Sequence, residues 1–118
     1  MAWHNDTGKL GEQMAFEWLE QQGYCILEKN WKYGKYEIDI ICVRDKKLHC
    51  IEVKTRRNTR FGYPEELVDR NKLYHFITAG TAYKRTKPQF KWIRFDILAI
   101  TLDKTNPPRF YLIEDVYL

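Results

Sequence analysis

The sequence has no apolar run that approaches the roughly 20 residues needed to span a bilayer. Its first residues, Met1 to Asp6, also lack the basic and apolar regions of a signal peptide. These absences predict a cytoplasmic protein that makes no membrane contact. A Gly-rich phosphate-binding loop is missing too, which argues against an ATPase or a kinase.

Cysteine is scarce, and no two of Cys25, Cys42 and Cys50 form a CxxC pair. An odd number leaves one thiol unpaired under any disulfide scheme, and the apolar neighbours predict buried thiols in a reducing compartment. Zinc is disfavoured because no further ligands stand at metal-binding spacing. The histidines lack a nucleophile or carboxylate at convincing spacing, so we predict a structural role for each: His4, His49 and His75.

The chain has 118 residues and a mass of 14.3 kDa, which is enough for one hydrophobic core but not for two. Hydrophobic residues at 44% and aromatic residues at 15% predict a folded globule. We therefore expect a single domain over residues 1–118. The net charge of +4 suits a polyanionic partner and an ordinary soluble surface equally well.

The hydrophobic periodicity predicts a mixed α/β order. The expected elements are a helix at 7–22, capped by Asp6 or Thr7 and ended by Gly23, a strand at 24–28, a loop at 30–35, a hairpin at 37–54, a basic loop at 56–64, a helix at 65–85, a strand at 92–101 and an edge strand at 110–113. The long step through the second helix suits a right-handed parallel crossover. We predict a mixed central sheet flanked by helices.

The hairpin at 37–54 is the most informative segment, because two β-branched-rich runs meet at a short polar turn. If Val43 pairs with Leu48, the numbers of paired residues sum to 91. Asp39 then lies opposite Glu52. Directly opposed residues share a face with Cβ atoms about 5 Å apart, so these carboxylates repel each other unless a cation lies between them.

Hard oxygen ligands of this kind suit Mg²⁺ or Mn²⁺. The same register sets Glu37 opposite Lys54, and Glu12 borders the apolar stripe of the first helix, from where it can lean over the hairpin. A metal beside the Lys54 ammonium can hold a water and an anionic substrate, as metal-assisted phosphodiester hydrolysis requires. The alternative is a solvated strand face with an ordinary Glu37–Lys54 ion pair, but Asp39 in register and Glu12 nearby favour a site.

Motifs along nearly the whole chain resemble the YraN-type family, small bacterial proteins with the PD-(D/E)XK nuclease fold that are akin to archaeal Holliday-junction resolvases. The matching segments are Gly8 to Glu12, Gly23-Tyr24, Asn30-Trp31, Glu37 to Ile41, Ile51 to Arg56, Phe61-Gly62, Pro64-Glu65 and Arg94 to Ile97. The resemblance implies a restriction-endonuclease-like α-β-β-β-α-β core.

The resemblance also implies roles for the hairpin residues. Asp39 and Glu52 would ligate Mg²⁺, with Mn²⁺ as an alternative, together with the Val53 backbone carbonyl. Lys54 would orient or activate the attacking water, and Glu12 would complete the site directly or through a metal-bound water.

The sequence departs from the family pattern next to Glu37, where Lys35-Tyr36 stands in place of a common glycine. Ile38 occupies the position of the proline in the fold's name. Glu37 itself is left with two roles, as a ligand of a second metal or as an ion-pair partner of Lys54.

Basic and aromatic residues beside the hairpin are the expected nucleic-acid contacts, because arginine binds phosphates and aromatic rings stack on unpaired bases. They are Arg56, Arg57, Arg60, Phe61, Lys72, Trp31 and Tyr33. Trp18 and Trp92 are expected in the core instead.

These observations predict a divalent-metal-dependent endonuclease acting on DNA, including branched or structured DNA. The alternatives are a nucleic-acid-binding domain with little or no cleavage activity and an RNA-processing nuclease, since no residue distinctively reads the 2′-hydroxyl. Resolvases cut two strands, so the resemblance also implies a homodimer.

Overall fold

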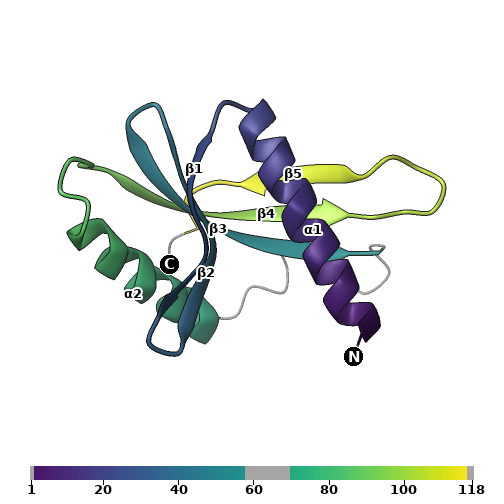
Figure 1. Ribbon diagram of the computed structural model, residues 1–118, viewed down its shortest axis with the longest axis horizontal. Helices are drawn as coiled ribbons and strands as arrows, with labels where there is room; N and C mark the ends of the chain where they lie inside the picture. Colours follow the sequence, from purple (N-terminus) through teal and green to yellow (C-terminus); the bar gives the residue numbers. More distant parts are fainter. Residues whose placement is uncertain (1, 58–69, 117–118) are drawn as a thin grey trace.

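A computed structural model describes the backbone of residues 2–57 and 70–116, and the side chains of these ranges from Gly8 onward (Figure 1). Its elements are α1 (Ala2–Gln21), β1 (Cys25–Tyr33), β2 (Tyr36–Arg44), β3 (Lys47–Arg56), α2 (Arg70–Arg85), β4 (Ile93–Thr101) and β5 (Arg109–Ile113). Their types and order agree with those predicted from the periodicity.

The strands form one mixed sheet in the order β1-β2-β3-β4-β5. Neighbouring strands are antiparallel except for β3 and β4, which run parallel. The parallel pair confirms the predicted crossover, in which α2 follows β3 in the chain and precedes β4. The result is the α-β-β-β-α-β core of a restriction-endonuclease-like fold.

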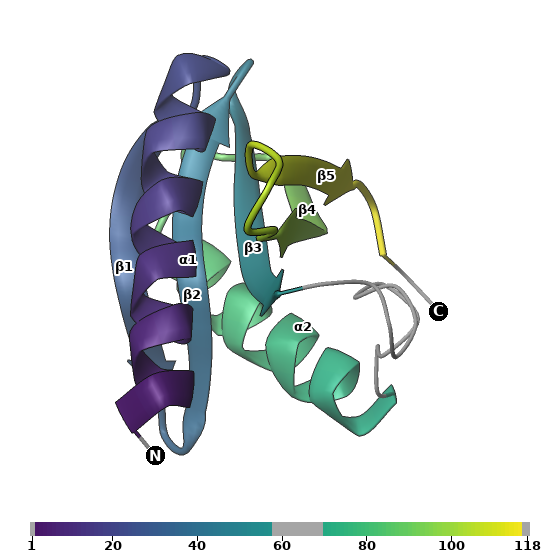
Figure 2. The ribbon, with the colours of Figure 1, turned by 90° about the vertical axis from the view of Figure 1, so that its right-hand side faces the viewer.

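The two helices cover opposite faces of the sheet (Figures 1 and 2). One core cluster joins α1 to the sheet and includes Ala15, Leu19, Ile40, Ile51, Leu98 and Ile100. The other joins α2 to the opposite face and includes Leu73, Phe76, Ile41, Leu48, Cys50 and Phe95. Because both faces are covered, the central strands are apolar at almost every position.

Two glycines let the helices approach the sheet closely. A Cβ atom built on Gly11 of α1 would lie 1.9 Å from Oγ1 of Thr55, and one on Gly80 of α2 would lie 2.4 Å from Cε1 of Phe95. No larger side chain fits at either position without a shift of the backbone or its neighbour. Gly11 therefore fixes the following residue, Glu12, beside the end of β3.

The predicted loop at 30–35 is wrong. The strand β1 continues to Tyr33, and the turn is confined to Gly34 and Lys35, with Gly34 at a φ of 61°. Asn30 adopts a φ of 51° within the strand, a conformation that Asn tolerates better than most residues. Trp31 packs against the α2 core cluster, so its burial favours a strand over a loop.

Some expected positions also differ. The helix α1 begins at Ala2, so Asp6 and Thr7 lie inside it rather than at its cap. Trp92 is 66% exposed because it precedes β4 instead of entering it, and Cys25 is exposed. Cys42 and Cys50 are buried as predicted.

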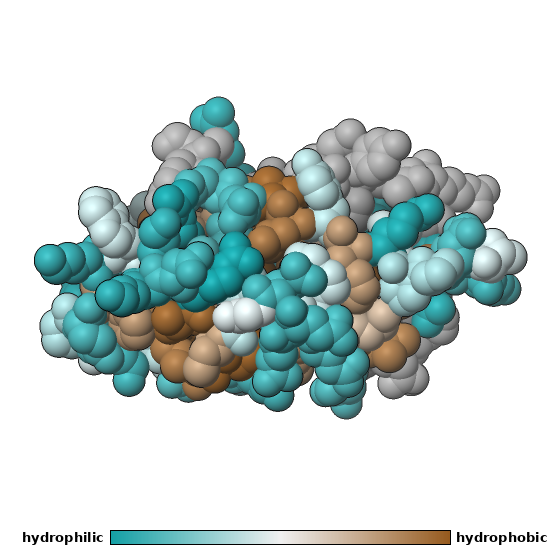
Figure 3. Space-filling model, turned by 90° about the horizontal axis from the view of Figure 1, so that it is seen from above, coloured by the Kyte–Doolittle hydropathy of each residue, from teal (hydrophilic) through white to brown (hydrophobic). Residues whose placement is uncertain are grey.

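The surface seen from above is mixed, with hydrophilic side chains over most of it and hydrophobic groups between them (Figure 3). Among the described residues, no helix combines the length and the apolar character needed to cross a membrane.

Candidate metal and nucleic-acid site

The hairpin has the predicted register where the strands are paired. Val43 lies opposite Leu48 and Ile40 opposite Ile51, so the paired numbers sum to 91. The turn residues Asp45 and Lys46 have φ values of 53° and 65°, as a two-residue type I′ turn requires. The strands β2 and β3 thus run in register from this turn to Ile40.

The ladder of β2 and β3 ends at Ile40 and Ile51, before it reaches the carboxylates. At the next step the backbone N–H of Val53 donates to Oδ2 of Asp39 at 2.8 Å. The Asp39 side chain therefore takes the acceptor position that a β2 carbonyl would hold in a continuous ladder. Asp39 lies between the two strands, and the simple face-to-face pairing with Glu52 is replaced by this arrangement.

The environment of Asp39 is strongly unfavourable to its negative charge. Burial above all, and then the charges of Glu52, Glu12 and Glu37, raise the pKa of Asp39 to about 7, against the lowering effect of the Val53 hydrogen bond. Three carboxylates from two strands and a helix thus act on one half-buried carboxyl group. Perturbation by burial and like charges is typical of functional sites.

A cleft of about 220 Å³ opens beside these residues on the face of the sheet covered by α2. Glu37 and Glu52 line it together with Lys35, Tyr36, Lys72, His75 and Phe76. Glu12 comes from α1 on the opposite face. Asp39 is therefore approached by carboxylates from both faces of the sheet.

Lys54 is half-buried on β3, two residues beyond Glu52. In the part of the chain that the structure describes, Glu37 and Lys54 form no ion pair with each other. The alternative of an ordinary cross-strand ion pair therefore does not account for these two residues.

The carboxylates around Asp39 are few for a fully protein-held divalent cation. Among side chains at 8–57 and 70–116, no group of three His, Cys, Asp or Glu is arranged so that it could hold a metal ion. Magnesium requires less than this, because it keeps several waters and is bound by one or two carboxylates plus substrate phosphates. Asp39 and Glu52 provide such a pair, and a cation would relieve the repulsion around Asp39. Carboxylate oxygens are the donor type that a partly hydrated Mg²⁺ prefers.

The predicted nucleic-acid contacts fall into three groups. Arg56 is the last residue of β3, and Arg57 follows it as an exposed residue. Both lie at the end of the strand that carries Lys54. Lys72 lines the cleft with Glu37 and Glu52. Arg60 and Phe61 lie outside the described residues.

The aromatic contacts are altered by the longer β1. Trp31 meets the Tyr83 ring edge-on at 5.0 Å and is half-buried, so it is largely a core residue. Tyr33 is 43% exposed and stacks on Trp31 with centroids 6.2 Å apart. Tyr33 is therefore the better stacking candidate of the two.

Sequence reasoning missed two residues of the cleft wall, His75 and Phe76. The rings of Tyr36 and His75 are stacked at 4.3 Å, with 14° between their planes. His75 was expected to be only structural. A sequence signal for this surface was available. His75 and Phe76 lie three and four residues after Lys72, a spacing that places all three on one face of a helix.

The order of the elements and the mixed sheet place the protein in the restriction-endonuclease-like fold class. Residues 11–100 match the model of a family described as "Uncharacterised protein family UPF0102". The chain belongs to this family, which is the YraN-type family that the motifs resemble.

Relatives named "UPF0102 protein" match most of the chain and most of their own length. The protein of Bacteroides thetaiotaomicron is 41% identical over 106 residues, covering 90% of this chain and 88% of its own. That of Dictyoglomus thermophilum is 46% identical over 104 residues, covering 87% and 88%. That of Cytophaga hutchinsonii is 47% identical over 98 residues, covering 83% and 87%.

Proposed function

We propose that the protein is a divalent-metal-dependent endonuclease that hydrolyses phosphodiester bonds in DNA, with branched or otherwise structured DNA as its substrate. One observation carries the proposal: the charges of Glu12, Glu37 and Glu52 act on the half-buried Asp39 at the open end of the β2–β3 ladder. A binding protein with no catalytic task gains nothing from such repulsion, because it destabilises the fold.

The proposed ligands of Mg²⁺ or Mn²⁺ are the carboxylates of Asp39 and Glu52 and the carbonyl of Val53. When bound, the metal supplies Lewis-acid polarisation of the phosphate and a more acidic water. The Val53 N–H holds the Asp39 carboxylate in one orientation. Glu12, on the α1 side, would complete the site directly or through a metal-bound water.

The Lys54 ammonium is the proposed source of positive charge for the phosphoryl group. Its place two residues after Glu52 on one strand keeps the cation and the carboxylate about 7 Å apart along the strand. An ammonium held there orients the attacking water and stabilises the negative charge that develops on the phosphate oxygens.

Substrate binding is assigned to the cations around the cleft. Lys72 comes from α2, and Arg56 and Arg57 come from the end of β3. These side chains bind backbone phosphates, while the exposed ring of Tyr33 offers a stacking surface for an unpaired base. Arg60 and Phe61 extend the same basic segment, and a homodimer would present two such sites to a branched substrate.

A second candidate is a nucleic-acid-binding domain with little or no cleavage. The observation that favours it is Tyr36, which stands where the family pattern has a glycine and lines the cleft while stacked on His75. A bulky side chain at this position narrows the approach of a phosphodiester to Glu37 and Glu52.

Cleavage assays with Mg²⁺ and with Mn²⁺ test the proposal on single-stranded, duplex, flapped and four-way DNA and on RNA. We expect Asp39→Asn and Glu52→Gln to abolish cleavage while binding is retained. Glu20→Gln is the matched control, because Glu20 is an exposed carboxylate on α1. Equal cleavage by the wild type and both site variants would refute the nuclease, and binding without any cleavage would support the second candidate. Cleavage confined to RNA would assign an RNA-processing nuclease.

A further inference from the structure

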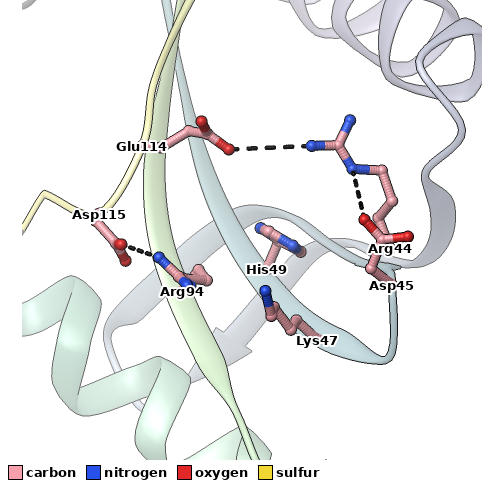
Figure 4. A pocket seen from close by; sticks show the side chains of 7 residues that line it. All are labelled: Arg44, Asp45, Lys47, His49, Arg94, Glu114 and Asp115. Carbon is pink, nitrogen blue, oxygen red and sulfur yellow. Dashed lines mark hydrogen bonds and ion pairs between the residues drawn. The ribbon is translucent and has the colours of Figure 1, made fainter.

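A second polar pocket, of about 280 Å³, lies around the β2–β3 turn, at the opposite end of the hairpin from Asp39 (Figure 4). It is lined by Arg44, Asp45, Lys47, His49, Arg94, Glu114 and Asp115. These residues come from β2, the β2–β3 turn, β3, β4 and the segment after β5, so only the folded chain brings them together. None of them belongs to the candidate nuclease site.

His49 is fixed at the base of this pocket. Its side chain is buried, and its Nδ1 lies 2.9 Å from Oδ2 of Asp96, which is fully buried. The other Asp96 oxygen accepts the backbone N–H of Asp115 at 3.0 Å. The Tyr24 ring packs edge-on against the imidazole with centroids 5.1 Å apart. The ring therefore has one orientation and little freedom to leave it.

This orientation determines which nitrogen is available. A carboxylate only accepts hydrogen bonds, so Nδ1 is the donor to Asp96 and Nε2 carries the lone pair in the neutral ring. Nε2 has no hydrogen-bond partner among the described residues. Nε2 is not one of the fully buried side-chain atoms that lack a partner. It is therefore accessible from the pocket that His49 lines. The pocket thus contains a fixed hydrogen-bond acceptor.

Side chains of both signs surround this acceptor, with Arg44, Lys47 and Arg94 beside Asp45, Glu114 and Asp115. Lys47 is half-buried and forms no ion pair with any residue at 8–57 or 70–116. Arg44 lies 4.0 Å from both Asp45 and Glu114, whose side chains are 84% and 58% exposed. Ion pairs this long and this exposed contribute little. Lys47 therefore keeps its capacity to bind an anion. Arg44 keeps only part of it, because its Nη1 also donates to the Gln22 carbonyl at 3.3 Å and its guanidinium lies 4.2 Å from the centre of the Tyr24 ring. Arg94 is already paired with Asp115.

We propose that this pocket binds a hydrogen phosphate ion. Lys47 and Arg44 donate to the oxygens of the ion, and the P–OH group donates to Nε2 of His49. A planar carboxylate has no hydrogen to donate once ionised, and neither has sulfate, which is otherwise close in shape and charge. Near neutral pH inorganic phosphate keeps at least one hydrogen, so it matches two donors and one acceptor together.

The test is a titration of the full-length ¹⁵N-labelled protein with inorganic phosphate near neutral pH, at constant ionic strength maintained with chloride. The ring nitrogens of His49 are followed by NMR. We expect a saturable shift of Nε2 in His49. Sodium sulfate in place of phosphate should bind at least about tenfold more weakly, because one hydrogen bond to a fixed acceptor is lost.

Two substitutions connect the shift to this pocket. Lys47→Gln should raise the dissociation constant for phosphate about tenfold, since a charge-assisted hydrogen bond is removed. Lys46→Gln is the matched control, because Lys46 is the exposed neighbour that does not line the pocket, and it should bind phosphate as the wild type does. Both variants replace surface lysines, so the comparison does not depend on altering the buried His49.

The source of the phosphate group is distinguished by a short single-stranded oligonucleotide with and without a terminal phosphate. A shift with inorganic phosphate alone identifies the free ion, and a shift that also appears with the phosphorylated oligonucleotide extends the site to phosphomonoesters. Absence of a saturable shift with phosphate overturns the proposal. Equal binding of sulfate, or an unchanged affinity in Lys47→Gln, overturns it as well.

Discussion

Replacing Asp39 with asparagine should stabilise the metal-free protein near pH 8, even though it should abolish cleavage. The pKa of Asp39 is raised from 3.8 to about 7 by burial and by neighbouring carboxylates. Between these values the folded chain holds a proton that the unfolded chain has lost. Stability therefore falls as the pH rises through this window, and the full penalty persists above about pH 7.

The size of the penalty follows from the same values. A difference from 3.8 to about 7 corresponds to at most about 4 kcal/mol, at about 1.4 kcal/mol per pH unit. Asp39 is partly exposed, so solvent screening reduces this to about 2–3 kcal/mol. Asparagine is neutral and similar in size, and its side-chain oxygen still accepts the Val53 N–H bond. The gain in the free energy of unfolding should thus be about 2–3 kcal/mol near pH 8 and negligible near pH 4.

Urea denaturation in a chelating buffer, followed by tryptophan fluorescence and circular dichroism between about pH 4 and pH 8, measures this difference. Glu20→Gln provides the control for loss of an exposed carboxylate, and its free energy of unfolding should follow the wild type at every pH. If the free energies of unfolding of the wild type and Asp39→Asn differ by the same amount at every pH, ionisation of Asp39 does not destabilise the fold and the prediction is refuted.

The remaining predictions concern the metal, the helix contact and the basic segment. Mg²⁺ at about 100 times its dissociation constant should raise the free energy of unfolding of the wild type by about 2.7 kcal/mol and leave Asp39→Asn unchanged, as measured by urea denaturation; equal effects on both proteins would remove Asp39 from the metal site. Gly11→Ala should destabilise the fold by about 1–3 kcal/mol, because its Cβ would lie 1.9 Å from Oγ1 of Thr55. Adding Thr55→Ala to this variant should restore part of the lost stability. A Gly11→Ala variant as stable as the wild type would show that α1 is free to shift. Arg57→Ala should weaken DNA binding and reduce the slope of log affinity against log salt by about one, measured by fluorescence anisotropy, whereas an unchanged slope would remove Arg57 from the interface.

Much of the central hairpin was predictable because the rules that fix it are local. A two-residue turn and β-branched runs set the register, which pairs Val43 with Leu48 and Ile40 with Ile51. The same local patterns gave the types and order of the elements, and the long connection between β3 and β4 indicated a parallel crossover. The family followed from short motifs around these elements.

Local patterns failed to predict strand ends and aromatic burial where tertiary packing overrides the local preference of the residues. The polar and aromatic residues at 30–33 resemble a loop, yet they pair with β2 and bury part of Trp31. Trp92 has a large apolar side chain of the kind expected in a core, but it lies outside the sheet and is exposed. In both cases the position of the strand end, which neighbouring strands determine, decides whether an aromatic ring is buried.

The sequence by itself determined which strands carry the carboxylates and Lys54, because alternation and turn length act within one hairpin. Only the tertiary structure decided how Asp39 is placed. The ladder opens after Ile40, Val53 turns its N–H to the carboxylate, and Gly11 lets α1 place Glu12 nearby. The pairing of His49 with Asp96 joins residues 47 positions apart, so no local pattern could indicate it. Electrostatic effects depend on distance and burial, and these are properties of the folded chain.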